Sequence, residues 1–475
     1  MKRQWLIAGL STYGFLCACA VGPDYKRPNS ELPSALFANS KDQNIEIIWW
    51  KQFGDETLDK LVHAAIKNNL DLEIALARVD EARARLGISK SQFWPNLDLN
   101  ASAVREKVTE TGLTPIPAGT DSTGNSFSLG LSLSYEIDLW GKIRRLNESA
   151  KAQLLNADYS RANVQLTVIS QVVNGYFALR SLDLQYAIAQ DTLKSRTESY
   201  ELMFKRFKGG IGSELDARQS ESEMHSAEAT VSKLADQIGR AESFLSVLIG
   251  QSPKEIIESP LARGRKLDDI VVPPQLPSAL PSSLLERRPD VSAAEQNLVS
   301  ANAQIGVAKA YYFPSISLGG LFGYESSELK NLFNNGSQTW GYGASISMPI
   351  FNGGRTGYLV EAATAQQKAA ELQYRQVIQN AFVEVRNALK TYESYALVVE
   401  AQKKQITAVE RNLYLAQLRY KNGQSPYLEV LDAERNLFQV QLDLVKSQQS
   451  RLVSVVDLYK SLGGGWKSDM KTSSK

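Results

Sequence analysis

The segment 126–139, SFSLGLSLSYEIDL, alternates strictly between two kinds of side chain. Serine, glycine and acidic residues occupy one parity, and the other parity is entirely apolar: Phe127, Leu129, Leu131, Leu133, Tyr135, Ile137 and Leu139. A period of two residues predicts a β-strand with two different faces. The segment 340–348 repeats this pattern, and weaker versions run through 97–103 and 316–322. The sequence therefore predicts four two-faced strands.

Strands of about ten residues with one apolar face match the wall of a transmembrane β-barrel. A half-buried sheet in a soluble domain is the alternative. Four strands cannot close a barrel, whose smallest common form has about eight, and unpaired strand edges cannot face lipid. A barrel must therefore combine strands from several copies, although the spacing alone does not say how many. The polar loops 106–125 and 326–339 are expected to face outside.

An internal duplication organises the rest of the chain. Residues 69–95 align without gaps on 288–314 at an offset of 219, and residues 206–250 align on 419–463 at an offset of 213. The change of offset means that the middle segments differ in length. Self-similarity of this kind indicates one supersecondary unit written twice.

Each repeat has the same predicted order: a helix ended by a proline, two strands, a very long helix, a glycine-containing turn and a returning helix. The expected first helices cover 70–93 and 289–312, and the expected long helices cover 142–208 and 355–421. A helix of about 65 residues is on the order of 100 Å long. Apolar residues recur along it at steps of three and four, as a coiled-coil hairpin requires.

The N-terminus predicts a lipid anchor. Lys2 and Arg3 precede an apolar stretch, 6–16, that is too short to span a bilayer. The following Leu16-Cys17-Ala18-Cys19 is similar to a bacterial lipobox, which predicts cleavage before Cys19 and covalent attachment of diacylglycerol and an N-acyl chain there. An ordinary cleavable signal is the alternative. Several acyl chains suffice for stable anchoring. Ala20 follows the cysteine instead of the aspartate of an inner-membrane retention signal, which favours the outer membrane.

These observations predict six regions along the chain. They are a signal peptide (1–18), an acylated irregular segment (19–68), the first repeat (69–250), a linker (251–287), the second repeat (288–463) and a C-terminal tail (464–475). The proline-rich stretches 22–56 and 251–281 are expected to be irregular.

The residue inventory argues against an enzyme and against a nucleic-acid-binding protein. The 53 basic and 51 acidic residues nearly cancel, and no basic stripe is present. The two histidines, His63 and His225, lie in helical patterns, and no cysteine–histidine cluster has metal-ligand spacing. We therefore expect no metal site and no cofactor beyond the lipid on Cys19.

Several motifs together carry a resemblance to a known family. They are CAVGPDY (19–25), Trp49-Trp50, LERRPDV (285–291), PIFNGGR (349–355), LEVLDAE (428–434) and SLGGGW (461–466). The chain resembles the TolC family of outer-membrane factors over nearly its whole mature length, specifically the lipoprotein (OprM-like, NodT) branch that serves RND-type pumps. Asn352 replaces the aspartate common in the family, and both residues favour turns.

The resemblance implies an α+β membrane protein. Four strands from each of three copies would form a trimeric, twelve-stranded transmembrane β-barrel, continuous with a long periplasmic α-helical barrel of coiled-coil hairpins. The implied function is the passive outer-membrane duct of a tripartite multidrug efflux pump. An inner-membrane RND transporter and a periplasmic membrane-fusion adaptor would be its partners. Type I protein secretion and heavy-metal efflux are alternative functions, and a lipid-anchored coiled-coil envelope scaffold is an alternative of another class.

Two candidate sites follow from the resemblance. Leu428 and Asp432 match the family's constriction, an apolar ring and an acidic ring one helical turn apart. Three converging aspartates would repel one another and attract cations. Alternatively, Asp432 merely lies early in a helix, where a carboxylate favours the dipole. The predicted adaptor contacts are small residues in the two hairpin turns, for which turn chemistry is the alternative explanation: Gly210, Gly212, Ser213, Gly423 and Ser425.

Overall fold

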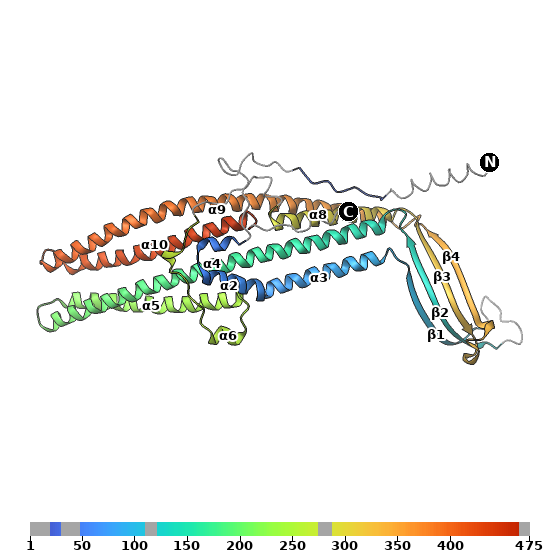
Figure 1. Ribbon diagram of the computed structural model, residues 1–475, viewed down its shortest axis with the longest axis horizontal. Coiled ribbons are helices and arrows are strands. Elements are labelled where there is room, and N and C mark those ends of the chain that lie inside the picture. The colour runs from blue at the N-terminus through green and yellow to red at the C-terminus, as the bar shows by residue number, and fades with distance from the viewer. Residues whose placement is uncertain (1–19, 30–47, 110–120, 274–286, 465–475) are drawn as a thin grey trace. The chain divides into compact units, whose positions relative to one another are not determined.

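The computed structural model describes residues 20–29, 48–109, 121–273 and 287–464. The chain forms two compact units. Figure 1 shows the ribbon coloured by residue number. The sheet unit comprises the described parts of Met1–Asn29, Val79–Ala157 and Ala294–Tyr374. The hairpin unit comprises those of Ser30–Arg78, Asp158–Ala293 and Arg375–Lys475. Cys19 and the middle of the first predicted loop lie outside the described residues.

The sheet unit contains one antiparallel sheet in the order β1-β2-β3-β4 (Figure 1). Its strands are β1 (Asn96–Lys107), β2 (Thr123–Ile137), β3 (Ser315–Ser326) and β4 (Gln338–Ser347). One row of register partners runs Leu99, Leu131, Phe322, Trp340. The register thus places the apolar parity of all four strands on one face, which confirms the predicted alternation. On the opposite face the Ser102 and Ser128 hydroxyls lie 2.8 Å apart.

The predicted strand boundaries were partly wrong. β1 and β3 run further than 97–103 and 316–322, so the loops predicted at 106–125 and 326–339 begin and end inside strands. Hydrogen bonding across each hairpin continues beyond the strictly alternating residues. β2 ends at Ile137 rather than at Leu139, because the Asp138 carboxylate accepts hydrogen bonds from the Ile143 and Arg144 amides and so starts the next helix.

The helices reproduce the duplication in their lengths. α3 (Leu70–Ser91) and α8 (Pro289–Ala310) have 22 residues each, and α4 (Lys142–Lys208) and α9 (Arg355–Lys421) have 67 each. α5 (Glu214–Leu248) and α10 (Tyr427–Ser461) have 35 each. α3 and α8 end two residues earlier than predicted, because each chain turns before its proline. No helix in the described ranges is both long and apolar enough to cross a bilayer.

Equivalent contacts close the two repeats. The Asn69 side-chain amide donates to the Leu248 carbonyl at 2.9 Å, and the Arg288 guanidinium donates to the Ser461 carbonyl at 3.0 Å. These positions correspond through the offsets of 219 and 213. Gly250 and Gly463 follow the returning helices with φ of +73° and +90°. A side chain at either glycine would meet the backbone of residue 68 or 287, so the positions require glycine.

Short helices pack against the long helices within the hairpin unit. Residues 19–68, expected to be irregular, contain η1 (Trp49–Phe53) and the amphipathic helix α2 (Glu56–Asn68). The stretch 251–281 contains α6 (Pro253–Glu258) and η2 (Leu267–Asp269). The Trp49 ring stacks on Tyr459 at 5.1 Å between centroids, and Phe53 packs edge-on against Phe177 at 4.9 Å.

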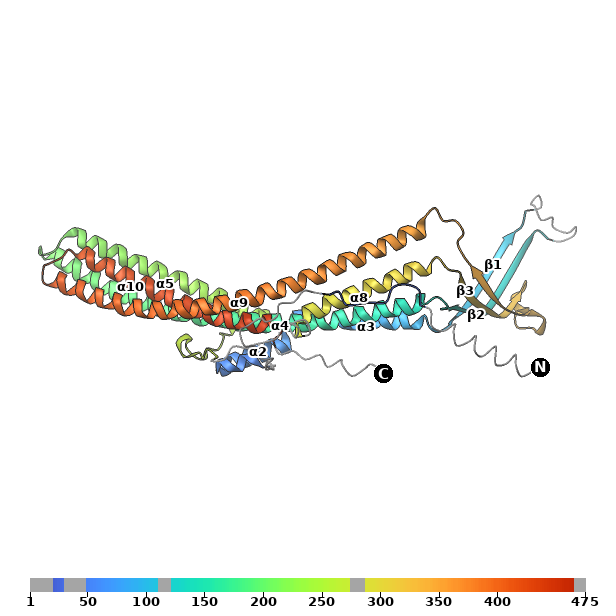
Figure 2. The same ribbon diagram turned by 90° about the horizontal axis from the view of Figure 1, so that it is seen from above.

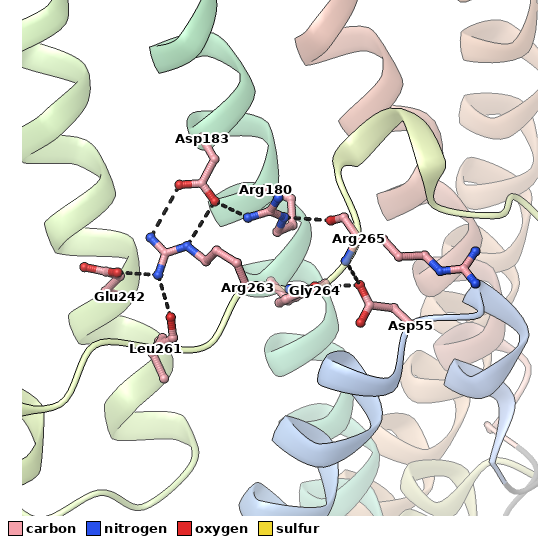
Figure 3. Close-up of polar contacts among 9 residues, drawn as sticks. Asp55, Arg180, Asp183, Glu242, Leu261, Arg263, Gly264 and Arg265 are labelled. Atoms are coloured by element: carbon pink, nitrogen blue, oxygen red, sulfur yellow. Dashed lines mark hydrogen bonds and ion pairs between the residues drawn. The ribbon is translucent and has the colours of Figure 1, made fainter.

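Polar contacts fix the irregular segment 261–265 against three helices (Figure 3). Arg263 donates to Asp183 of α4 at 3.1 Å and to Glu242 of α5 at 2.5 Å. Asp55, which caps α2, accepts from the Arg265 amide at 2.8 Å and from the Tyr176 hydroxyl at 2.6 Å. Burial and the Asp55 carboxylate both raise the pKa of Tyr176, so the phenol remains a donor.

Candidate functional sites

The two hairpin turns share one backbone geometry. Gly210 and Gly423 have φ of +73° and +71°, and in each turn the amide of the next residue donates back to the final turn of the preceding long helix. These bonds join Ile211 to the Arg206 carbonyl at 3.0 Å and Gln424 to the Arg419 carbonyl at 2.9 Å. This is a Schellman-type helix end, for which glycine is the favoured residue. Turn chemistry therefore accounts for both glycines, and their predicted contact with an adaptor stays a prediction.

The other predicted contact residues differ between the turns. Ser213 caps α5, because its hydroxyl accepts from the Leu215 amide at 3.1 Å. Pro426 occupies the corresponding position before α10 and makes no side-chain cap. A side chain at Gly212 would meet Arg206 at 2.8 Å, so the first turn needs a small residue there, whereas Ser425 occupies the equivalent position of the second turn.

The two predicted constriction residues lie on one face of α10. Leu428 is 45% exposed and the Asp432 side chain is 63% exposed. α10 begins at Tyr427, and its first-turn acid is Glu429. The helix dipole acts mainly within the first turn, so it accounts for Glu429 better than for Asp432.

Asp432 belongs to a chain of charges that joins the two hairpins. Its carboxylate lies 3.2 Å from the Arg435 guanidinium, which in turn contacts Glu223 of α5 at 2.6 Å. Glu223 also pairs with Arg196 of α4 at 3.0 Å, and both are over nine-tenths buried. The nearby Glu434 has a pKa raised by burial, an effect that Arg196 opposes and Glu223 reinforces.

An apolar cluster packs the same hairpin ends together. Leu431 of α10 is 1% exposed and Met203 of α4 is 5% exposed. The buried members are Met203, Ala217, Ala416, Tyr427, Val430, Leu431 and Ala433. In Figures 1 and 2 the hairpins α4–α5 and α9–α10 lie side by side. The charged chain and this cluster therefore hold one hairpin against the other.

Residues 20–28, which we call the strap, are fixed to the sheet unit by contacts with both repeats. The Val21 amide donates to the carbonyl of Trp140, in the segment between β2 and α4, at 3.0 Å. Asp24 pairs with Arg145 at 2.7 Å. Arg27 makes two hydrogen bonds of 2.6 Å to Glu295. The strap therefore begins, at Ala20, beside the segment that joins β2 to α4.

Sequence reasoning found Asp432 but missed Arg435 and Glu223. Arg435 lies three residues after Asp432, and this spacing on a helix could have suggested the pair. Glu223 lies 212 residues away from Arg435 in the sequence, and no local pattern points to it. Among the described residues, no group of three or more histidine, cysteine, aspartate or glutamate side chains is arranged to hold a metal ion.

A four-stranded sheet with one apolar face, joined in sequence to long paired hairpins, defines the class of outer-membrane channels with a helical extension. The chain belongs to the outer membrane efflux protein family, which it matches over residues 61–251 and 280–464. It is therefore a TolC-family outer-membrane factor, an efflux channel rather than an enzyme.

Relatives and solved structures agree over nearly the whole chain. Cation efflux system protein CusC of Escherichia coli O6:H1 is 32% identical over 95% of this chain and 96% of CusC. Probable efflux pump outer membrane protein TtgC of Pseudomonas putida is 32% identical over 98% of this chain and 96% of TtgC. The Campylobacter jejuni CmeC outer membrane channel superposes with a TM-score of 0.88 at 29% identity, covering 94% of this chain and 96% of CmeC.

Family membership confirms the predicted fold class and compartment. Channels of this family are trimers with a β-barrel in the outer membrane and a long α-helical barrel in the periplasm. They work with an adaptor and an inner-membrane transporter. The lipid on Cys19, the domain boundaries, the constriction and the adaptor contacts stay predictions.

Proposed function

We propose that this channel is the exit duct of a tripartite RND-type pump for several organic compounds. The observation that carries the proposal is the polar face of the sheet, which would line the lumen. It presents mainly small side chains with hydroxyl and amide groups, such as Asn100, Ser102 and Ser128. Four carboxylates share this face: Asp98, Glu106, Glu136 and Glu325. Strands β1 to β4 contain no methionine, histidine or cysteine, the ligands that a soft-metal path would use. A lining of this kind admits many solutes and leaves selection to the transporter.

Efflux of metal ions is the second candidate, because CusC is named as a cation efflux protein. Relatives named for antibiotic and solvent efflux match to a similar degree, so relationship alone favours neither cargo. The two candidates differ in what a deletion strain should accumulate. Loss of the channel should raise the cellular content of several unrelated organic compounds in the first case and of metal cations in the second.

Leu428 and Asp432 form the proposed gate of the resting duct. In a trimer, three copies of the exposed Leu428 side chain would converge in one layer and three Asp432 carboxylates in the next. Arg435 and Glu223 would hold each carboxylate in place, because the charged chain ties α10 to the neighbouring hairpin. The adaptor would open the gate by engaging the turns that contain Gly210 and Gly423.

Cys19 is the proposed lipid anchor. The strap supports this assignment, because it brings the chain to the base of β2, at the membrane-facing end of the helices. Mass spectrometry of the mature N-terminal peptide should find diacylglycerol and an amide-linked acyl chain on Cys19. An unmodified N-terminus at another residue would contradict the assignment.

Accumulation of drugs in a deletion strain tests the main proposal. The strain is complemented with wild type, Cys19→Ala or Asp432→Ala, and uptake of several dyes and antibiotics is compared with uptake of metal cations. Wild type should lower accumulation of unrelated organic compounds, and Asp432→Ala should admit large antibiotics that wild type excludes. If deletion changes no organic compound and abolishes metal tolerance or secretion of one protein, the cargo assignment is wrong.

A further inference from the structure

The open edges of the sheet should pair with those of a second copy in a register that the internal duplication defines. β1 and β4 are the two edge strands of the isolated sheet. Their apolar side chains are more exposed than those of the inner strands. Tyr342 and Ile346 of β4 are 85% and 71% exposed, whereas Leu131 and Leu133 of β2 are each 40% exposed. A neighbouring strand at each edge would cover this surface.

The duplication relates the strands as well as the helices. β1 corresponds to β3 through the offset of 219, and β2 corresponds to β4 through the offset of 213. The observed registers test this relation: Ser102 pairs with Ser128 in the first repeat, and the corresponding Leu321 pairs with Gly341 in the second. The two repeats therefore build the same hairpin without a slip.

The contact between β2 and β3 joins one repeat to the other within the chain. In a ring of copies, the contact between β4 and the next copy's β1 joins the same two kinds of repeat in the same order. The register between copies therefore follows from the β2–β3 register. Adding 213 to each β2 residue number gives the β4 residue, and subtracting 219 from its β3 partner gives the β1 residue of the next copy. The pair Ile137 and Ile316 becomes Ile350 opposite Leu97, and the pair Ser132 and Leu321 becomes Ser345 opposite Ser102.

We propose that each copy pairs β4 with β1 of the next copy in this register, with Ser345 opposite Ser102 and Ile350 opposite Leu97. The proposal rests on the trimeric channel described above. It places Ile350, three residues beyond the end of β4 and 90% exposed in the isolated chain, within the paired strand. It also places Tyr342 opposite Arg105 and Trp340 opposite Lys107, two pairs of an aromatic and a cationic side chain on the lipid-facing side.

Two features of the sheet agree with this register. A shift by one residue would set the apolar parity of β4 against the polar parity of β1, and the proposed register avoids this. The Val108 amide donates to the Ser122 carbonyl, so even-numbered β1 residues bond to β2 and odd-numbered residues direct their backbone groups to the open edge. Because this direction alternates from strand to strand, the even-numbered β4 residues direct their backbone groups to the other open edge. The proposed pairs join odd β1 residues to even β4 residues wherever backbone hydrogen bonds must form.

The same alternation makes the Ser102–Ser345 pair a non-hydrogen-bonded one, in which Cα atoms lie about 4.5 Å apart. That separation suits a disulfide. The double variant Ser102→Cys/Ser345→Cys is expressed in the outer membrane, oxidised with copper–phenanthroline and analysed on a non-reducing gel. Ser132→Cys/Leu321→Cys is the matched control, because it is the equivalent pair within one chain and should cross-link without joining copies.

Covalent trimers should form in Ser102→Cys/Ser345→Cys and should be absent from both single variants. The slipped pairs Asn100→Cys/Ser345→Cys and Ser102→Cys/Ser347→Cys should react roughly tenfold more slowly, because diagonal positions lie about 7–8 Å apart. If a slipped pair reacts faster in a protein that migrates as a native trimer, the proposed register is wrong. The trimeric channel assembly would still be supported. If unheated samples contain no trimer, the channel assembly itself is wrong.

Discussion

The two hairpins have the same length and the same turn, but they carry different chemistry at their ends. The offset of 213 pairs Asp432 with Gln219, and it pairs Arg435 with Ser222. The acid and its arginine therefore belong to the second hairpin alone. Conversely, the first hairpin supplies Glu223, whose equivalent is Asn436.

The difference between the hairpins shows that two copies of one structural unit can carry different functional residues. The second hairpin carries the exposed carboxylate of the proposed gate and the arginine beside it, and the first carries the buried Glu223 and Arg196, of which Glu223 contacts that arginine. The following predictions test this division of roles, and they run from the largest expected effect to the smallest.

Glu223→Gln should destabilise the hairpin unit most. The substitution leaves the buried Arg196 guanidinium without its charged partner, which costs about 3–5 kcal/mol when one member of a buried ion pair is removed. Chemical denaturation followed by circular dichroism measures the loss. Glu221→Gln is the control, because Glu221 pairs with the exposed Arg218 and should cost below about 1 kcal/mol. Equal losses in the two variants would show that the charged chain does not hold the hairpins.

Leu431→Ala should weaken the packing between hairpins. Leu431 is 1% exposed within the apolar cluster, and truncating such a leucine costs about 2–5 kcal/mol. The equivalent residue of the first repeat is Arg218, whose side chain is 62% exposed, so Arg218→Ala should change the melting temperature little. A melting temperature unchanged in both variants would mean that the cluster contributes nothing to stability.

Glu434→Gln should flatten part of the pH dependence of stability. Burial raises the pKa of Glu434 in the folded chain, so folding favours its protonated form. The stabilisation by protonation is complete below the unfolded pKa of about 4.3 and is lost as the pH rises through the folded pKa. Melting temperatures of wild type and variant should therefore converge in acid and separate at neutral pH, with the variant more stable. A constant difference across the pH range would contradict this role.

Ser213→Ala should have the smallest effect. Loss of a serine cap costs about 1 kcal/mol, and Ser213 caps α5 whereas Pro426 provides no such bond to α10. Hydrogen exchange should therefore speed up in the first turn of α5 and stay unchanged at the start of α10. Faster exchange in both helices would indicate that the turns act as one unit.

Sequence alone predicted the elements that obey a period. The four strands and the paired long helices follow from alternation, from three- and four-residue spacing and from the duplication. Boundaries set by a side chain were less predictable: β2 ends at Ile137 because Asp138 caps the following helix, although the apolar parity continues to Leu139. α2 was not predicted, because it is a helix of only 13 residues directly after a proline-rich stretch. Its apolar face consists of four buried residues, Leu58, Leu61, Val62 and Ala65.

The candidate sites were predictable only where their residues lie close in sequence. Leu428 and Asp432 are one helical turn apart, and the lipobox is continuous. The charged chain from Asp432 to Arg196 joins residues of both repeats, and the strap joins residue 27 to residue 295. Such contacts depend on tertiary packing, for which a single sequence holds no periodic signal.

The strap also constrains the order in which the chain can fold. Arg27 contacts a residue 268 positions later, and the Pro23 carbonyl contacts one 279 positions later. The strap therefore cannot dock until the second repeat's short helix α8 has formed, since closing so long a loop is unfavourable before its contacts exist. The earliest residues of the sheet unit are thus among the last to reach their final positions.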